Sequence, residues 1–354
     1  MNANDIAVLT DNLVRTYKVL STGFYDPGIY FETAGGRFLY EVFMRSITKK
    51  VVIFALNGVN INVRRGEFVC ILGPNGSGKT TLIKILATLI PPMSGKAEVM
   101  GYDVVKDKDE VVKLVTYIPS ILGASAWARP RLTVRRNIVL ACRLFGIPKD
   151  EGLEAAKKLG LDEYLDRPFG SLSTGLQARV GLLIGVLRRT PVYLLDEPLM
   201  GISPEAARLL RSYFLKINRE FGITFLYATH RPLEAQELAT RVIILHRGKV
   251  VADGSPDDLI RKANVEEAIE LEMYKAYFNI EEVLRRYEPN YVHVEHLEPE
   301  AGAFKVIVGI RCCDDVLPRL IEELVSRGAK IRRLRVRRAS LEDAYLYYVG
   351  GGSG

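Results

Sequence analysis

The apolar positions of the chain fall into two alternating patterns. Short, unbroken apolar runs, which are typical of buried strands, are followed by segments in which apolar residues recur every three to four positions, as in helices. The runs at 67–72, 192–195 and 223–228 predict three buried strands. After the first run, apolar residues at helical spacing are Leu82, Ile83, Ile85, Leu86 and Leu89. Strands that alternate with helices indicate a mostly parallel sheet.

The flanking segments extend this α/β pattern. Residues 5–20 predict a strand, and the sheet is expected to resume near Val51. Pro91 and Pro92 would end the helix that follows the first buried run. Elsewhere we expect short strands around a polar stretch at 96–120, mainly helices at 130–190, and a hairpin at 242–253 that turns at Arg247-Gly-Lys249.

The composition changes after Gly254-Ser-Pro-Asp257. We predict a charged helix at 265–288, strands at 291–297 and 304–310, a helix at about 316–326, a basic strand, and a last helix from Leu341. The chain is therefore expected to hold a core domain at 5–254, an accessory α+β domain at 255–349, and a flexible Gly/Ser tail at 350–354.

Composition and charge narrow the class of protein. Of the 354 residues, 48% are hydrophobic and 26% are charged, as in globular proteins. No apolar run reaches the roughly 18 residues of a membrane-spanning helix, and we expect no secretory leader. The four cysteines show no disulfide or metal spacing, which favours a reducing, cytoplasmic setting. The net charge is +7, but the basic run at 330–338 has no interleaved aromatic residues, so a solvated strand face is favoured over nucleic-acid binding.

Residues 73–81 fit the pattern G-x-x-x-x-G-K-[ST] and lie between the first buried run and its helix. In such a loop the glycines let backbone N–H groups point at phosphate oxygens. The lysine supplies positive charge for the β- and γ-phosphates, and the threonine hydroxyl suits Mg²⁺. A helix that starts there adds the positive end of its dipole. The predicted phosphate-binding residues are Gly73, Pro74, Asn75, Gly76, Ser77, Gly78, Lys79, Thr80 and Thr81.

Two acidic residues, Asp196 and Glu197, follow the apolar run at 192–195. In a P-loop fold this strand lies beside the phosphate loop, so Asp196 is expected to hold Mg²⁺. Glu197 is expected to orient or deprotonate the attacking water. Two acids after a strand are a weak signal by themselves, but downstream of a P-loop they become a strong one.

A second candidate anion site precedes the long helix predicted after residue 175. Ser173 and Gly175 could cap that helix and direct N–H groups at an anion. Taken alone, this segment is better explained as an ordinary helix N-cap.

The P-loop, Leu172-Ser-Thr-Gly-Leu-Gln177, Leu194-Leu-Asp-Glu-Pro198 and Ala228-Thr-His230, in this order, resemble the ATP-binding subunit of an ABC transporter. The resemblance covers about residues 5–254. It implies ATP and Mg²⁺ as cofactors and an α/β P-loop fold with an antiparallel β subdomain, an inserted segment at about 21–50 and a helical subdomain at about 120–190. The motif Ala339-Ser-Leu-Glu-Asp343 is similar to the end of exporter ATPases of the daunorubicin-resistance (ABC-2) type.

The resemblance also implies partners. Two such subunits, in a homodimer or a heterodimer, face each other head to tail, and Ser173, Gly175 and Gln177 of one chain complete the ATP site of the other. His230 matches the histidine that contacts the γ-phosphate. Tyr17 matches the aromatic residue that stacks on adenine, with Phe54 as a competing candidate. An integral membrane permease is the expected second partner, which would place the chain at the inner face of the membrane.

Two positions depart from the family pattern. Ser120 stands where a glutamine normally contacts Mg²⁺ and signals to the permease, although Ser120 could still reach a metal-bound water. Ser203 stands where an aspartate normally couples the two sites of the dimer. Neither change removes the predicted catalytic residues Lys79, Glu197 and His230, so we expect ATP hydrolysis.

The predicted function is an ATPase subunit that dimerises around ATP and powers export through a separate permease. One alternative is the hydrolysis-poor half of a heterodimer, which the serines at 120 and 203 motivate. Another is an ABC ATPase without a transport role, which a single P-loop and the absence of sustained heptads disfavour. The segment at 38–50 is either a basic patch for the membrane or permease, or a helix of the core.

Overall fold

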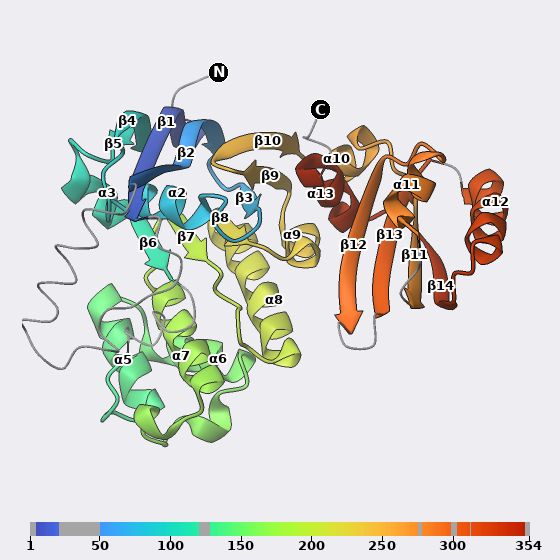
Figure 1. Cartoon of the computed structure of the whole chain (residues 1–354). Coiled ribbons are helices and arrows are strands. Elements are labelled where there is room, and N and C mark those ends of the chain that lie inside the picture. Colours follow the sequence, from blue (N-terminus) through green and yellow to red (C-terminus); the bar gives the residue numbers. More distant parts are fainter. Residues whose placement is uncertain are drawn as a thin grey trace, which may run out of the picture.

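The computed structural model describes residues 5–20, 50–119, 128–274, 278–298, 303–311 and 313–350. Within these residues the chain forms three sheets, two of them in a larger part of the molecule and the third in a smaller part beside it (Figure 1). Residues 21–49, which hold all of the predicted insertion and of the predicted helix at 38–50 except Lys50, and residues 351–354 of the predicted tail lie outside the described residues.

The central sheet has the strand order β10-β9-β3-β8-β7-β6, and all its pairs except the β9–β10 hairpin are parallel. This confirms the predicted parallel sheet and hairpin. Its inner strands are buried on both faces, which explains why they read as continuous apolar runs. The strands are β3 (Phe68–Leu72), β6 (Val115–Ile118), β7 (Val192–Asp196), β8 (Thr224–Thr229), β9 (Arg241–His246) and β10 (Lys249–Gly254).

A second, antiparallel sheet covers one face of the central sheet, with helix α2 (Lys79–Leu86) between them. The core of this layer joins Val8 and Val59 to Ile83 and Ile71, all 0% exposed. Burying each such side chain contributes about 1.5–3 kcal/mol. The strands, in sheet order, are β2 (Lys50–Arg64), β1 (Ile6–Leu20), β4 (Ser94–Val99) and β5 (Tyr102–Asp103).

Helices cover the opposite face of the central sheet, and α5, α6 and α7 form a separate group below it (Figure 1). The predicted helical stretch at 130–190 is therefore confirmed. The helices of this face are α5 (Val134–Phe145), α6 (Lys149–Lys158), α7 (Thr174–Leu187), α8 (Pro204–Phe221) and α9 (Pro232–Leu238), with 3₁₀ turns at Asp162–Tyr164 and Phe169–Ser171. Helix α3 (Lys108–Leu114) instead packs into the core under the antiparallel sheet.

The residues after 254 form a third, antiparallel sheet in the order β12-β13-β11-β14. Its succession β-α-β-β-α-β is that of a ferredoxin-like unit. The elements are α10 (Pro256–Lys262), β11 (Glu267–Tyr274), α11 (Ile280–Arg285), β12 (Tyr291–Glu298), β13 (Ala303–Ile310), α12 (Cys313–Ser326), β14 (Ile331–Arg338) and α13 (Leu341–Gly350). Helix α13 packs against α9 and α10 and joins this unit to the larger part.

Two predictions are wrong at the level of single elements. The predicted charged helix at 265–288 is mainly the inner strand β11 followed by the short helix α11. Helix α2 ends at Leu86 rather than at the prolines, because Thr88 adopts the left-handed conformation (φ 60°). Leu89 consequently lies outside the helix and is 56% exposed.

Candidate functional site

The phosphate loop is built where β3 ends and α2 begins. Gly78 has φ 110°, and a Cβ on it would lie 2.1 Å from the carbonyl oxygen of Ala55. A Cβ on Gly73 would lie 2.2 Å from the carbonyl oxygen of Leu245. The backbone therefore packs so closely around the loop that these two positions accept only glycine.

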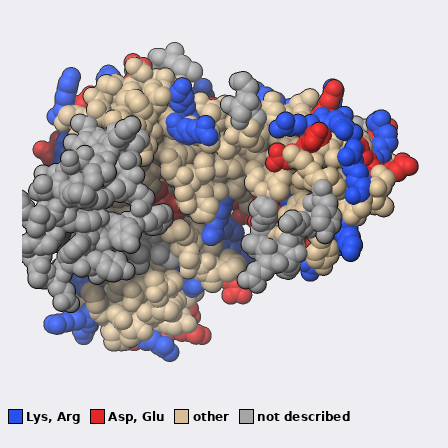
Figure 2. Space-filling model, in the orientation of Figure 1, with Lys and Arg blue, Asp and Glu red and all other residues tan. Residues whose placement is uncertain are grey.

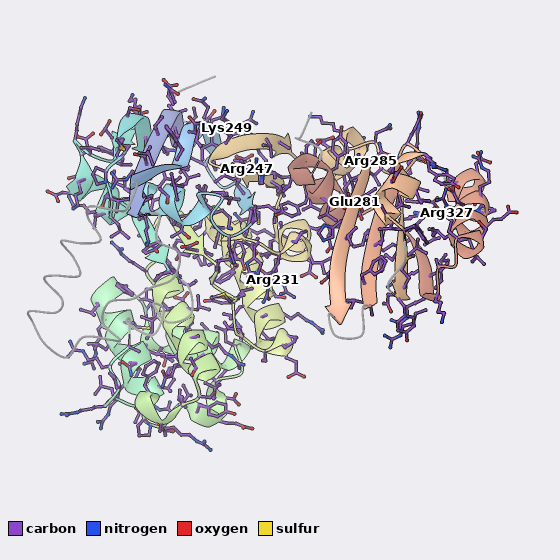
Figure 3. All side chains as sticks on the ribbon, viewed as in Figure 1. Arg231, Arg247, Lys249, Glu281, Arg285 and Arg327 are labelled. Carbon is purple, nitrogen blue, oxygen red and sulfur yellow. The ribbon has the colours of Figure 1, made fainter. Side chains whose placement is uncertain are left out.

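The β9–β10 turn supports the loop from behind. The Gly248 N–H donates to the Ser77 carbonyl at 3.0 Å, and the Asn57 N–H donates to the Gly248 carbonyl at 2.8 Å. Arg247 and Lys249 flank this glycine at the turn (Figure 3). The hairpin thus links β2 to the phosphate loop.

A cavity of about 370 Å³ opens over the loop. It combines residues from four separate segments of the chain. Its volume and its mixture of apolar and polar side chains are those of a small-molecule site. Its lining residues are Tyr17, Ile53, Ala55, Asn75, Gly76, Ser77, Gly78, Lys79, Thr80, Thr81 and Glu197. Phe54, which is 50% exposed, does not line it. Ile53 lies opposite Tyr17 in the β1–β2 pairing, so the two share one side of the sheet and Phe54 lies on the other. Ala55 stands at an irregularity in this pairing, between Phe54 and Leu56.

Lys79 lies across the floor of the cavity and is 5% exposed. Its Nζ donates to the carbonyl oxygens of Gly73 at 2.7 Å and Pro74 at 3.1 Å, and lies 3.8 Å from Glu197 Oε1. Burial lowers the pKa of Lys79, while the nearby carboxylates of Glu197 and Asp196 oppose that shift. The loop's own carbonyls therefore hold a desolvated ammonium group beside the cavity.

Thr80 and Asp196 meet from neighbouring elements. The Thr80 hydroxyl donates to Asp196 Oδ1 at 3.0 Å, although the two residues are 116 positions apart. Asp196 is 6% exposed, and burial raises its pKa, while the hydrogen bond from Thr80 lowers it. A hydroxyl and a carboxylate oxygen in contact are ligands that suit Mg²⁺.

Glu197 and His230 lie at the ends of adjacent strands. The parallel pairing places Asp196 opposite Ala228, and the Glu197 N–H donates to the Ala228 carbonyl at 3.0 Å. His230 Nδ1 is 2.8 Å from both carboxylate oxygens of Glu197. Glu197 has φ 50°, a conformation that few non-glycine residues adopt and that often marks functional sites.

The segment with Ser173, Gly175 and Gln177 does not line this cavity. Ser173 is the N-cap residue of α7, is exposed, and forms no side-chain cap. An added Cβ on Gly175 would meet no atom within 4 Å. Gln177 Nε2 donates to the Leu172 carbonyl at 3.1 Å, which fixes the start of the helix. The first turn of α7 is therefore a surface feature of this single chain.

The departures from the expected pattern differ in outcome. Ser120 lies outside the described residues. Ser203 is the exposed N-cap residue of α8 and forms no side-chain cap. Sequence reasoning missed Ile53 and Ala55 as lining residues, because their place at the cavity depends on the pairing of β1 with β2, which is irregular at Ala55. It also missed the contact between Gly248 and the phosphate loop, for which no local signal exists.

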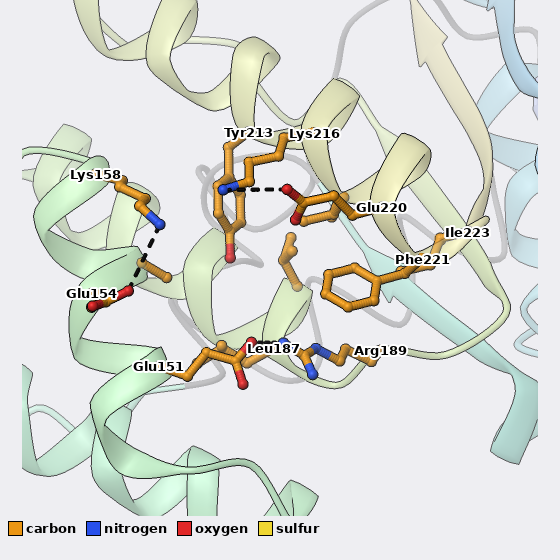
Figure 4. Close-up of a pocket in the computed structure, with 13 residues that line it drawn as sticks. Glu151, Glu154, Lys158, Leu187, Arg189, Tyr213, Lys216, Glu220, Phe221 and Ile223 are labelled. Atoms are coloured by element: carbon orange, nitrogen blue, oxygen red, sulfur yellow. Dashed lines mark ion pairs between the residues drawn. The ribbon is translucent and has the colours of Figure 1, made fainter.

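A smaller cavity of about 60 Å³ lies between α6, α7 and α8 (Figure 4). Ion pairs surround it, including Lys158–Glu154 at 3.8 Å and Lys216–Glu220 at 3.5 Å. It is several times smaller than typical ligand pockets. The cavity over the phosphate loop is the better candidate for a nucleotide.

Two arginines of the basic strand β14 are paired with acids of the neighbouring strand β11. Arg333 pairs with Glu272 at 3.3 Å, and Arg337 pairs with Glu270. On the face shown in Figure 2, Lys and Arg side chains over this end of the molecule lie beside Asp and Glu. The prediction of a solvated strand face, rather than a nucleic-acid site, agrees with this pairing.

No helix in the described ranges combines the length and the apolar content needed to cross a membrane.

Comparison with known proteins agrees with the geometry. The model of the ABC transporter family matches residues 56–200. The glycine betaine/carnitine/choline transport ATP-binding protein OpuCA of Bacillus subtilis is 35% identical over 213 residues, 58% of this chain and 55% of OpuCA. The chain thus spans about half the length of this relative.

Two other relatives are matched over most of their length. The bacitracin transport ATP-binding protein BcrA of Bacillus licheniformis is 28% identical over 300 residues, which are 84% of this chain and 94% of BcrA. The ABC transporter ATP-binding protein NatA of Bacillus subtilis is 30% identical over 223 residues, which are 62% of this chain and 89% of NatA.

Among solved structures, a bacterial ABC transporter cassette determined as a dimer is 25% identical, with a TM-score of 0.53. The likeness covers 70% of this chain and 98% of that one. The predicted ABC-type α/β fold is confirmed. With the family match, the identity to NatA over most of its length, and the shared fold, the chain belongs to the ATP-binding proteins of ABC transporters.

Proposed function

We propose that this chain binds and hydrolyses ATP, dimerises around the nucleotide, and drives substrate transport through a separate membrane permease. The observation that carries the proposal is that Lys79, Thr80 and Glu197 line one cavity, with Asp196 bonded to Thr80 and His230 bonded to Glu197. These residues come from the phosphate loop and from the ends of two neighbouring strands, which is the arrangement that phosphoryl transfer requires.

The loop residues would hold the nucleotide. The Nζ of Lys79 would exchange its carbonyl contacts for β- and γ-phosphate oxygens, and their negative charge would offset the lowering of its pKa by burial. Backbone N–H groups of the loop and the start of α2 supply further donors. Tyr17, 39% exposed at the cavity wall, offers a ring for the adenine base.

Thr80 and Asp196 would hold Mg²⁺, since their oxygens already meet at 3.0 Å. When bound, the metal would offset phosphate charge that would otherwise repel the two carboxylates of the site. The raised pKa of buried Asp196 fits a carboxylate that awaits a cation.

Glu197 would orient the attacking water and take its proton. In this structure its carboxylate is held by His230 Nδ1 at 2.8 Å. We propose that His230 keeps Glu197 aligned and contacts the γ-phosphate when ATP is bound. Both groups lie on rigid strand ends, so positioning and electrostatic stabilisation, rather than covalent chemistry, would lower the barrier.

The exposed first turn of α7 supports a head-to-tail dimer. Ser173 and Gly175 do not line the cavity of their own chain, yet they offer an uncapped helix N-terminus to an anion. We propose that they complete the site of a second subunit, in a homodimer or a heterodimer. In the alternative reading, Ser203 marks this chain as the hydrolysis-poor half of a heterodimer.

We propose export as the direction of transport, of the daunorubicin-resistance (ABC-2) type, at the inner face of the membrane. The match to a bacitracin transport protein extends over 300 residues, whereas the match to the spermidine/putrescine import protein PotA of Haemophilus influenzae extends over 208. The longer match, together with the motif at 339–343, favours the exporter group. We further propose that residues 5–254 act as the ATPase domain and 255–349 as an accessory domain.

The test is ATP hydrolysis by the purified chain, alone and mixed with candidate partner subunits. Wild-type protein should hydrolyse ATP with Mg²⁺, and Glu197→Gln should bind ATP and form a dimer that light scattering detects. If Glu197→Gln hydrolyses ATP at the wild-type rate, Glu197 is not the base. If only a mixture with a second ABC subunit is active, the heterodimer reading is correct.

A further inference from the structure

The segment that carries His230 is held by a buried carboxylate. Glu234, in the first turn of α9, is 8% exposed. Its Oε2 accepts hydrogen bonds from the hydroxyls of Tyr227 and Thr229, each at 3.0 Å, and its Oε1 accepts from Arg231 Nη1 at 3.2 Å. Burying a carboxylate is unfavourable unless donors surround it, and here three donors do.

Two of these donors belong to Thr229 and Arg231, the residues on either side of His230. The Thr229 hydroxyl donates to Glu234 and also accepts a hydrogen bond from the Arg231 N–H at 3.1 Å. Arg231 is the N-cap residue of α9, so its backbone N–H is satisfied through a hydroxyl that Glu234 orients. In an ordinary capping box, an acidic residue at N3 accepts a hydrogen bond from the N-cap N–H directly. Here the Thr229 hydroxyl stands between the two groups and relays the interaction.

The same strand end sets the reacting groups. The Thr229 carbonyl accepts a hydrogen bond from the Gly73 N–H at 3.3 Å, at the start of the phosphate loop. His230 Nδ1 lies 2.8 Å from Glu197. A displacement of about 1 Å in a group that positions the reaction can lower the rate up to a hundredfold.

We propose that Glu234 is a positioning residue for His230. Its carboxylate fixes the turn from Thr229 to Arg231 and thereby directs the imidazole toward Glu197. An apolar side chain at this position would avoid the desolvation of a charge, but it could not bond both neighbours of the histidine. The proposal rests on the proposed ATPase function.

Glu234→Gln tests the proposal, because it keeps the side-chain volume and replaces one acceptor oxygen with a donor. We expect kcat for ATP hydrolysis to fall about tenfold, with KM for ATP changed less than about twofold. Thr229→Val, which removes the hydroxyl relay and keeps the shape, should give the same loss.

Glu237→Gln is the matched control. It removes the same charge from the same helix, but Glu237 is exposed and pairs with Arg211 of α8 at 2.8 Å rather than with the turn that holds the histidine. Its kcat should stay within about twofold of wild type. A loss equal to that of Glu234→Gln would mean that charge on α9, rather than the network, matters.

A double-mutant cycle with His230→Ala separates positioning from general stabilisation. If Glu234 acts through His230, the double variant hydrolyses ATP at the rate of His230→Ala alone. A further tenfold loss in the double variant would overturn the proposal. If His230→Ala leaves the wild-type rate unchanged, the role proposed for His230 itself fails, and the positioning role fails with it.

A second readout does not depend on turnover. The chain has four histidines, so the imidazole NMR signal of His230 can be assigned by its loss in His230→Ala. Glu234→Gln should shift this signal and Glu237→Gln should not. An unshifted signal in Glu234→Gln would contradict the proposal even if its kcat falls.

Discussion

Asp343 is a fully buried carboxylate in α13, at 0% exposed, and its replacement should loosen the accessory unit. It accepts hydrogen bonds from Arg337 Nη2 at 3.0 Å, from the Ser340 N–H at 2.7 Å and from the Ser340 hydroxyl at 2.9 Å. Arg337 Nη1 and the Tyr291 hydroxyl also bond to it. One carboxylate thereby ties α13 to strands β14 and β12.

Asp343→Asn replaces one acceptor oxygen with an amide N–H₂ group, which faces the Arg337, Ser340 and Tyr291 donors. It also removes the negative charge that pairs with Arg337. Breaking a buried ion pair by changing one partner costs about 3–5 kcal/mol. Glu270 remains bound to Arg337, so we expect the lower end of this range. The local free energy of unfolding of β12, β14 and α13 should fall by about 3 kcal/mol, measured by native-state hydrogen exchange.

The pH dependence gives an independent check. Burial by itself would raise the pKa of Asp343, but hydrogen bonds from Arg337, Tyr291 and Ser340 outweigh it and lower the pKa. Because the folded-state pKa lies below the unfolded value of about 3.9, the stabilisation is complete above that value. It is lost as the pH falls through the folded-state pKa, and Asp343→Asn should lack this component.

Glu342→Gln is the control, since Glu342 is the adjacent acid and lies at the edge of a cavity near His230. Its effect should stay within about 0.5 kcal/mol. A change below about 1 kcal/mol in Asp343→Asn, or an unaltered acid response, would refute the reasoning that this network holds the accessory unit together.

The remaining predictions concern the nucleotide site. Glu197→Gln should lower kcat about 10²- to 10⁴-fold without preventing ATP binding, in a steady-state phosphate-release assay. Gly78→Ala should abolish binding of a fluorescent ATP analogue, because its Cβ would lie 2.1 Å from a carbonyl oxygen. Gly76→Ala should weaken this binding less, because its Cβ would meet no atom within 4 Å. Gly175→Asp should leave the fold and ATP binding intact, because the position is open, yet abolish hydrolysis by setting a negative charge against the partner's γ-phosphate.

The charged segment at 265–288 shows where local pattern failed. Its glutamates suggested a solvated helix, but in β11 they alternate with Ile269, Leu271 and Met273, which are buried. The acid on the other face is matched from neighbouring strands: Glu270 pairs with Lys305 at 3.1 Å and with Arg337. Only cross-strand pairing makes so many charges compatible with an inner strand.

The aromatic residues near the phosphate loop show how the structure separates two candidates. From the sequence, Tyr17 matches the aromatic residue that stacks on adenine, and Phe54 is a competing candidate. The pairing of β1 with β2 sets Tyr17 opposite Ile53, and both line the cavity, whereas Phe54 does not. Strand register, which depends on contacts between distant segments, therefore decides which of the two aromatic residues lines the cavity, while the adenine contact itself stays a prediction.

The sequence by itself determined what is chemically local: the phosphate loop, the acids after β7, the apolar runs of the central sheet, and the family. These features need only consecutive residues and their periodicity. The tertiary structure alone decided what distant segments do together. It set Thr80 at 3.0 Å from Asp196 and His230 at 2.8 Å from Glu197, and it kept Ser173 away from the cavity. It also bonded Glu234 to the residues on either side of His230. Parallel pairing of β7 with β8 accounts for the contact between Glu197 and His230, because it aligns strand ends that the sequence separates by dozens of residues.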